Sequence, residues 1–295
     1  MKLVTYQTSQ SPARVGALHG ETVVDLAAAH AAAGGHSSFP TTLQSLLEAG
    51  DAGMALAREA LAFAVRHPDK YAAPVNTTTL LAPLPRPGKI ICLGRNYAAH
   101  AKEGGAEVLE YPILFFKPAT SVIGPGAAIV VPSATTKPDY EAELAVVIGR
   151  TCKDVDEAHA LEYVAGYTCA NDVSARDLQK RTHQWDQGKM LDTFCPLGPA
   201  LVTADEIPDP GQLDIKSILN GEVMQHSTTA LMIFSVPFTI SYISKIATLE
   251  AGDIILTGTP DGVGQARNPP VFLQNGDTIT IEVEKVGTLT NRVTR

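Results

Sequence analysis

The sequence is short of positive charge, and it lacks both long apolar runs and any basic cluster. It has 23 lysine and arginine residues against 31 aspartate and glutamate residues, which gives a formal net charge of −8. This balance argues against nucleic acid as a partner. No stretch approaches the ~20 apolar residues that span a bilayer, so we expect no membrane contact.

Cysteine is also scarce, and its spacing excludes the usual metal and redox motifs. Cys92, Cys152, Cys169 and Cys195 are far apart and include no C-x-x-C pair, so no zinc signature is present. We expect reduced, mostly buried thiols. The N-terminus runs directly into a strand-like pattern instead of a signal peptide, and we therefore expect a cytoplasmic protein.

The composition is otherwise that of a globular protein, with 45% hydrophobic residues over 295 positions. Segment 82–88 carries three prolines at alternate positions and predicts a stiff linker. It separates a small N-terminal α/β domain over 1–81 from a larger domain over 89–295. Within the first domain, short strands precede helical stretches that are rich in alanine and leucine at 26–33 and 43–66.

The larger domain is dominated by predicted strands without regular strand–helix alternation. Residues 140–148 form the clearest strand, and Asn220-Gly221 predicts a hairpin turn. Asp154 resembles the first residue of an acidic capping box, opening a helix over 157–164. A further helix is predicted over 235–246. The pattern predicts an α+β fold with a mixed or antiparallel β-roll.

Two glutamates interrupt the apolar strand at positions two residues apart. Glu141 and Glu143 share one face because strand side chains alternate, and burying two bare carboxylates together is costly. A divalent cation would offset that cost. Asp172, which follows an apolar run, would complete an oxygen site for Mg²⁺, Mn²⁺ or Ca²⁺. The alternative is an edge strand with two solvated glutamates and a capping aspartate.

His100 and Glu103 are spaced to share one face of a short helix. A carboxylate beside an imidazole raises its basicity and fixes its orientation, as a general base requires, although the spacing alone favours a surface pair without a role. The glycine-rich segment 256–264, with Thr259, could bind a small carboxylate or be simply a tight turn. Lys189 could stabilise an enolate or be solvated.

The polar segment 178–190 predicts a loop near the site. His183 and Trp185 within it could line a lid or serve only loop packing. We interpret Arg176 and Asp177, which precede this segment, as a structural ion pair.

These residues form an ordered series of motifs. The series is Gly94-Arg95-Asn96-Tyr97-x-x-His100-x-x-Glu103, Phe116-Lys117-Pro118, Glu141-x-Glu143, Asn171-Asp172-x-x-Ala175-Arg176-Asp177, Gly188-Lys189 and Leu256-Thr257-Gly258-Thr259-Pro260-x-Gly262-Val263-Gly264. It resembles the fumarylacetoacetate hydrolase family. The resemblance is greatest to the acylpyruvase and oxaloacetate-decarboxylase-like members with an N-terminal extension domain, and it runs from about Lys89 to the C-terminus.

The resemblance implies a mixed β-sandwich roll for the catalytic domain and a homodimer. It implies Mg²⁺ or Mn²⁺, with Ca²⁺ a further possibility, on the three carboxylates described above. It also implies that the His100–Glu103 pair activates water and that Lys189 stabilises negative charge. The residues expected to contact the substrate are Gln179, Thr259, Gly258, Arg95 and Tyr97.

The activity implied is metal-dependent hydrolysis of the C–C bond of a 2,4-dioxo acid. An acylpyruvate or fumarylpyruvate would give pyruvate and a carboxylic acid. The alternative on the same metal site is oxaloacetate decarboxylation, or isomerisation or tautomerisation of a 2-oxo diacid. A third hypothesis is a catalytically silent, metal-dependent ligand-binding protein. The presence of His100, Glu103 and Lys189 argues against it.

Overall fold

The structure is a computed structural model that describes residues 1–9, 11–105 and 107–295. Its largest sheet has the order β4-β3-β2-β1-β14-β12-β11-β17-β6-β7, with β5 paired to β1 and β8 paired to β14. The strands are β1 (Lys2–Thr8), β2 (Ser11–His19), β3 (Thr22–Asp25), β4 (Ala72–Pro74), β5 (Thr79–Leu80), β6 (Ile90–Gly94), β7 (Ile113–Phe116), β8 (Val122–Ile123), β11 (Ala142–Ile148), β12 (Val164–Asn171), β14 (Cys195–Thr203) and β17 (Ile254–Leu256).

A second sheet has the order β16-β15-β18-β19-β9 and packs against the first. Its strands are β9 (Ile129–Val130), β15 (Asp214–Leu219), β16 (Glu222–Thr228), β18 (Thr278–Val283) and β19 (Gly287–Thr294), and a separate ribbon pairs β10 (Pro138–Asp139) with β13 (Ser174–Ala175). Most pairs are antiparallel, but β17 with β6, β8 with β14 and β9 with β19 are parallel. The predicted α+β class, a mixed β-sandwich roll, is confirmed.

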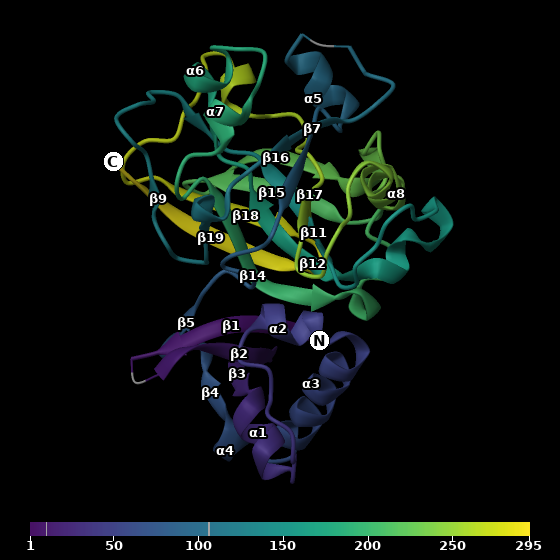
Figure 1. The fold of residues 1–295 in the computed structure, drawn as a ribbon. Helices are drawn as coiled ribbons and strands as arrows, with labels where there is room; N and C mark the ends of the chain where they lie inside the picture. Colours follow the sequence, from purple (N-terminus) through teal and green to yellow (C-terminus); the bar gives the residue numbers. More distant parts are fainter. Residues whose placement is uncertain (10, 106) are drawn as a thin grey trace.

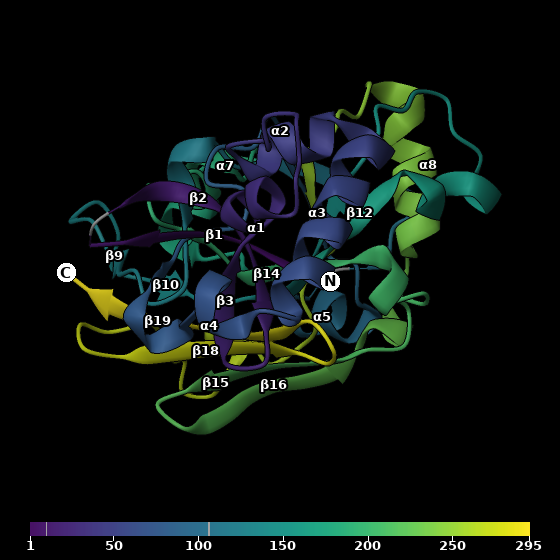
Figure 2. The same ribbon diagram turned by 90° about the horizontal axis from the view of Figure 1, so that it is seen from below.

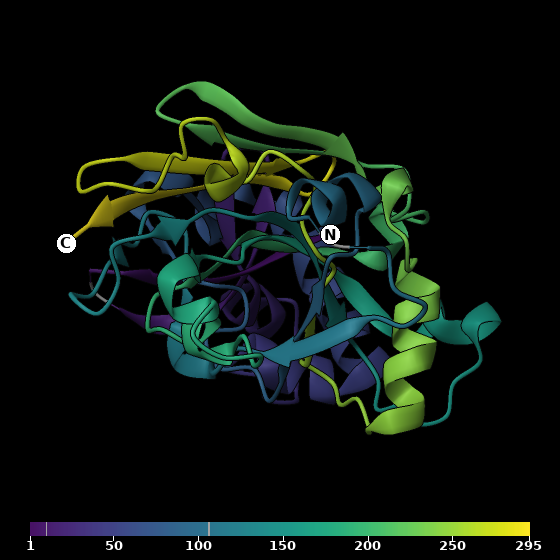
Figure 3. The same ribbon diagram turned by 90° about the horizontal axis from the view of Figure 1, so that it is seen from above.

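Helices lie at both ends of this sandwich and along one side of it. They are α1 (Leu26–Ala32), α2 (Leu43–Glu48), α3 (Gly50–Val65), α4 (Pro68–Tyr71), α5 (Ala98–Glu103), α6 (Arg176–Gln179), α7 (Asp186–Lys189) and α8 (Val236–Ile246). Figure 1 shows α1 to α4 at the bottom, and α5, α6 and α7 together at the top. Figure 2 views the N-terminal elements from below, and in Figure 3, from above, these purple elements lie behind the rest.

The central strand β11 is buried on both of its faces. Leu144 and Val146 lie in the core between the two sheets, whereas Ala145 and Val147 face the core that α1, α2 and α3 cover. A strand that packs against other elements on both faces needs apolar side chains at every position. This explains the uninterrupted hydrophobic sequence of β11 after Glu143. Glu143 continues the Ala145 face beyond the end of that apolar run.

The N-terminal segment joins the main sheet directly. Lys2 and Leu3 of β1 pair with Val202 and Leu201 of β14, and the amino group of Met1 donates a 2.6 Å hydrogen bond to Thr203 Oγ1. The division into domains at residues 82–88 stays a prediction. Across the described parts of the chain, no helix has the length and apolarity needed to cross a membrane.

The predicted hairpin turn and the predicted helix over 235–246 were confirmed, whereas the helical stretch over 43–66 was only partly correct. Asn220 and Gly221 have φ angles of 51° and 88° and turn the β15–β16 hairpin as expected. Ser235 caps α8 by accepting the N–H of Phe238. The helical stretch predicted over 43–66 is instead two helices, because Gly50 has a φ of 59° and breaks it.

The predicted capping box at Asp154 was wrong. Asp154 has a left-handed φ of 54°, so it lies outside any helix. The segment Glu157–Tyr163 is a 3₁₀ helix that begins after Asp156, which makes no side-chain cap. The acidic spacing pattern therefore marked a bend at Asp154, three residues before the helix begins.

Candidate active site

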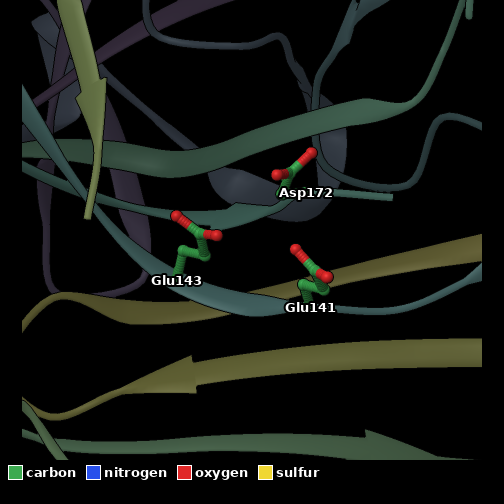
Figure 4. A group of neighbouring side chains, drawn as sticks. All are labelled: Glu141, Glu143 and Asp172. Atoms are coloured by element: carbon green, nitrogen blue, oxygen red, sulfur yellow. The ribbon is translucent and has the colours of Figure 1, made fainter. Parts of the chain in front are cut away.

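The three carboxylates predicted as metal ligands come together because of strand register. In the antiparallel pair of β11 and β12, Ala142 lies opposite Asn171 and Glu143 lies opposite Ala170. Glu141 is therefore beside Asp172, whose N–H donates a 3.0 Å hydrogen bond to the Glu141 carbonyl. Each of the three side chains offers one oxygen within 4.8 Å of the others, and Figure 4 shows the carboxylates turned toward one another.

All three carboxylates are buried, which excludes the alternative of solvated glutamates on an edge strand. Glu141 is 4% exposed, Glu143 1% and Asp172 0%. Lys189 Nζ lies 2.7 Å from both Glu141 Oε2 and Asp172 Oδ2, and Lys117 Nζ lies 2.6 Å from Asp172 Oδ1. Lys189 is therefore a buried cation at the end of α7 and not a solvated loop lysine.

Arg176 has different partners from those expected. Its Nε lies 2.8 Å from Asp139 Oδ2, and its Nη2 lies 2.8 Å from Glu141 Oε1. Asp177 instead accepts hydrogen bonds from Thr135 and Thr136. The predicted Arg176–Asp177 ion pair was wrong, because adjacent residues at the start of α6 point in different directions.

Glu143 differs electrostatically from its two neighbours. It accepts a 2.7 Å hydrogen bond from the Gly258 N–H, and within the described residues it has no ion pair. Burial, with Asp172 and Glu141 nearby, raises its pKa well above the usual range. Lys189, Arg176 and His100 instead outweigh burial at Glu141 and hold the pKa of that carboxyl well below its usual range.

With all four carboxylates ionised, the buried cluster would carry one negative charge that its own cations do not neutralise. Four carboxylates, from Asp139, Glu141, Glu143 and Asp172, meet three cations, from Lys117, Arg176 and Lys189. Removing an uncompensated charge from water is unfavourable. Hard oxygen donors with one excess negative charge fit a divalent cation such as Mg²⁺ or Mn²⁺.

The His100–Glu103 pair forms as predicted and is anchored to a distant turn. His100 Nδ1 lies 2.8 Å from Glu103 Oε1, and the Gly262 N–H donates a 2.9 Å hydrogen bond to Glu103 Oε2. The pair is partly buried on α5. Glu103 thereby orients the imidazole and joins α5 to the glycine-rich segment that carries Thr259.

Thr259 is held by Gln225, a residue that belongs to none of the sequence motifs. Gln225 Nε2 donates 2.8 Å hydrogen bonds to Thr259 Oγ1 and to the Pro260 carbonyl, while its Oε1 accepts the Ala142 N–H. Because Thr259 Oγ1 accepts from Gln225, its own proton remains available to a ligand. Gln225 is buried on β16, and only the packing of the two sheets brings it here.

A cavity of about 440 Å³ brings most of the predicted site residues together. Those that line it are Arg95, His100, Glu103, Glu141, Glu143, Gln179, Lys189 and Thr259, with His183 and Trp185 from the segment predicted to lie near the site. Gln179 Oε1 accepts from Arg176 Nη1 at 3.1 Å, so its amide N–H groups remain free to donate.

Two residues expected to contact the substrate lie elsewhere. Tyr97 is 1% exposed and does not line the cavity, and burial with Glu143 nearby raises the pKa of its hydroxyl. Gly258 also lies outside the lining and uses its N–H to position Glu143. The geometry therefore gives Tyr97 a packing role and Gly258 a role in holding a carboxylate.

Comparison with known proteins identifies the family of this chain. The family model described as fumarylacetoacetate (FAA) hydrolase C-terminal matches residues 89–294. The chain belongs to the fumarylacetoacetate hydrolase family. It is 46% identical over 257 residues to "Oxaloacetate tautomerase Fahd2a, mitochondrial" from Rattus norvegicus, an alignment that covers 87% of this chain and 80% of that protein.

Solved structures of family members extend the similarity to the whole chain. A putative HpcE protein from Mycobacterium smegmatis has a TM-score of 0.86 and 36% identity, covering 100% of this chain and 99% of that one. Maleylpyruvate hydrolase from Sphingobium sp. SYK-6, in complex with manganese(II) and pyruvate, has a TM-score of 0.79 and 31% identity over 100% and 99% of the two chains. The rat protein is named mitochondrial, so the expected cytoplasmic location stays a prediction.

Proposed function

We propose that this protein interconverts the enol and keto forms of a 2-oxo diacid of the oxaloacetate type. The observation that carries the proposal is that the hydrogen-bonded His100–Glu103 pair and the carboxylates of Glu141 and Glu143 open into one cavity. The similarity to a protein named oxaloacetate tautomerase supports this reaction over the C–C hydrolysis expected from sequence.

Glu141, Glu143 and Asp172 would hold the divalent cation, Mg²⁺ or Mn²⁺. When bound, the ion supplies positive charge that favours the enolate form of a 2-oxo acid. Manganese in the maleylpyruvate hydrolase structure supports a divalent cation in this family. Ca²⁺ has the same preference for oxygen ligands, and a titration with each cation distinguishes the three.

The proton transfer falls to His100. Glu103 occupies Nδ1, so Nε2 is the atom that takes a proton from C3 of the keto form. The electron pair of that C–H bond becomes the C2–C3 double bond. The 2-oxo oxygen takes a proton from a water molecule to give the enol, and the proton that His100 gives up restores that water. The reverse sequence returns the proton to C3, so neither direction consumes water or breaks a carbon–carbon bond.

The remaining polar groups bind and orient the substrate. Lys189 Nζ has three N–H donors and uses two of them on Glu141 and Asp172, which leaves the third for the developing enolate oxygen. The hydroxyl of Thr259 and the amide of Gln179 can donate to the 1-carboxylate. Each of these donors is held in place by a protein partner before substrate arrives.

The direct test follows the absorbance of the oxaloacetate enol with Mg²⁺ or with EDTA, with total oxaloacetate and pyruvate measured in parallel. We expect faster enol–keto equilibration with Mg²⁺ and no matching gain in pyruvate. Pyruvate released as fast as the enol disappears would instead indicate a decarboxylase. No acceleration over the protein-free Mg²⁺ control would reject the proposal.

Hydrolysis of a 2,4-dioxo acid is the second candidate function, supported by the maleylpyruvate hydrolase similarity. The same His100 could take a proton from water instead of from C3. Release of pyruvate plus a carboxylic acid from acetylpyruvate or fumarylpyruvate would favour it. The homodimer implied by the family resemblance is likewise a proposal, which light scattering tests directly.

A further inference from the structure

Arg95 is a cation in the cavity that has no carboxylate partner. The two buried cations of the lining, Arg176 and Lys189, are paired with acidic residues. Within the described chain, the guanidinium of Arg95 has neither a hydrogen bond nor an ion pair, and its contact is the ring of Trp185, 5.3 Å from Cζ to the centroid. Its charge is therefore available to a ligand.

The backbone around Arg95 is held in a conformation that suits glycine better. Arg95 has a left-handed φ of 58°, and the next residue, Asn96, is clamped by hydrogen bonds to Phe234 and Thr257. A non-glycine residue costs about 1–2 kcal/mol in this region. A long charged side chain at such a position indicates that the side chain itself is used.

Trp185 fixes the direction of the Arg95 side chain. The indole lies over Gly94, where an added Cβ would collide with the ring, and it contacts Phe115 edge-on with centroids 5.9 Å apart. An arginine that stacks on an aromatic ring keeps its N–H groups free at the edge of the guanidinium plane. The tryptophan thus presents the cation to the cavity without neutralising it.

The wall between Arg95 and the carboxylate cluster is aromatic. Lys189 Nζ lies 5.0 Å from the Phe115 ring centroid, and Trp185 comes next along the wall, with Arg95 beyond it. Two aromatic rings of the lining therefore connect the cation of Lys189 to the cation of Arg95. A ligand with a carboxylate at each end of a short carbon chain matches this pattern.

We propose that Arg95, supported by Trp185, binds the distal carboxylate of the substrate and so selects 2-oxo diacids over 2-oxo monoacids. This inference rests on the proposed function, because it assumes that the 2-oxo end of the ligand lies at Glu141, Glu143 and Asp172. A guanidinium binds a carboxylate through two parallel N–H donors, which suits recognition of a planar anion. Lys180, which also lines the cavity, adds positive charge.

Binding can be measured without turnover, because Trp185 is the single tryptophan of the chain. The Mg²⁺-loaded protein is titrated with pairs of equal chain length: oxaloacetate with 2-oxobutanoate, 2-oxoglutarate with 2-oxopentanoate, and 2-oxoadipate with 2-oxohexanoate. Indole fluorescence reports occupancy, and calorimetry gives an independent Kd. The series also identifies the chain length that reaches Arg95.

We expect Arg95→Gln to weaken the best-bound diacid roughly ten- to a hundredfold and to change its matched monoacid by less than about twofold. Arg95→Lys should fall between, because it keeps the charge and loses the planar fork. Arg95→Gly relieves the left-handed backbone while removing the guanidinium, so we expect it to keep the fold and to lose diacid binding as Arg95→Gln does. Lys102→Gln, which removes an exposed charge on α5 outside the cavity, is the matched control.

Equal losses for diacids and monoacids in Arg95→Gln, or no loss for any diacid, would overturn the inference. Failure of the proposed function gives a different result. In that case the wild-type protein discriminates diacids from monoacids in an Arg95-dependent way, yet does not accelerate the equilibration of oxaloacetate.

Discussion

Glu103 links the two halves of the candidate active site through its contact with Gly262. One carboxylate oxygen lies 2.8 Å from His100 Nδ1, and the other accepts the Gly262 N–H at 2.9 Å. The base on α5 and the segment that carries Thr259 are thus held by a single side chain. This contact makes the position of His100 depend on Gly262, which is 159 positions from Glu103 in the sequence.

Replacing Glu103 separates orientation from charge. Glu103→Gln can still accept the Gly262 N–H and contact His100, but it no longer balances a protonated imidazole. We expect kcat for oxaloacetate tautomerisation to fall by about 10–100-fold with little change in KM, a part of the ~10²–10⁴ that a positioned acid–base group supplies. A rise in KM with unchanged kcat would instead assign Glu103 to substrate binding.

Glu143 should behave as a metal ligand that destabilises the metal-free protein. In Glu143→Gln the amide oxygen still accepts the Gly258 N–H, and the variant loses a buried carboxyl whose raised pKa costs folding free energy at neutral pH. We expect the metal-free variant to melt at a higher temperature than the metal-free wild type. We also expect the added stability from Mg²⁺ or Mn²⁺ to be largely lost, as scanning calorimetry with and without EDTA would show.

The matched control for that experiment is Glu110→Gln, an exposed carboxylate outside the cavity. It should melt like the wild type in both conditions. Undiminished metal stabilisation in Glu143→Gln would contradict the assignment of Glu143 as a ligand.

Asn96 should be a major contributor to local stability. It is fully buried, its amide donates to the carbonyls of Phe234 and Thr257, and its side-chain oxygen accepts the Phe234 N–H. Asn96→Ala leaves these buried groups unpaired and should lower the free energy of unfolding by about 2–4 kcal/mol. Urea unfolding measures this change. Asn76→Ala, at an exposed position, should leave the free energy of unfolding nearly unchanged. Equal changes in the two variants would contradict a stabilising role for the Asn96 hydrogen bonds.

The sequence predicted the carboxylates better than it predicted their partners. Period-2 alternation placed Glu141 and Glu143 on one face, and their burial confirms that something must offset their charge. Lys117 and Arg176 were visible as motif residues, but their partners lie on other elements. Spacing along the chain carries no information about which cation meets which carboxylate across a sheet.

Site residues on the second sheet could not be predicted from the sequence for the same reason. Gln225 lies on a strand with an ordinary hairpin pattern, and it reaches Thr259 only because the two sheets pack together. Similarly, the motif that contains Tyr97 selected this residue as a site residue but did not indicate which way its side chain points. In the structure the side chain is buried and does not line the cavity.

The most direct test of the account is hydrogen exchange at C3 of oxaloacetate in D₂O, followed by proton NMR with Mg²⁺ and either wild-type protein or His100→Gln. The account predicts that the wild type accelerates loss of the C3 proton signal in a metal-dependent way, and that His100→Gln loses about 10²–10⁴ of that rate while still binding Mg²⁺. Exchange in the variant at the wild-type rate, or wild-type turnover to pyruvate without exchange, would contradict the assignment of His100 as the group that moves the C3 proton.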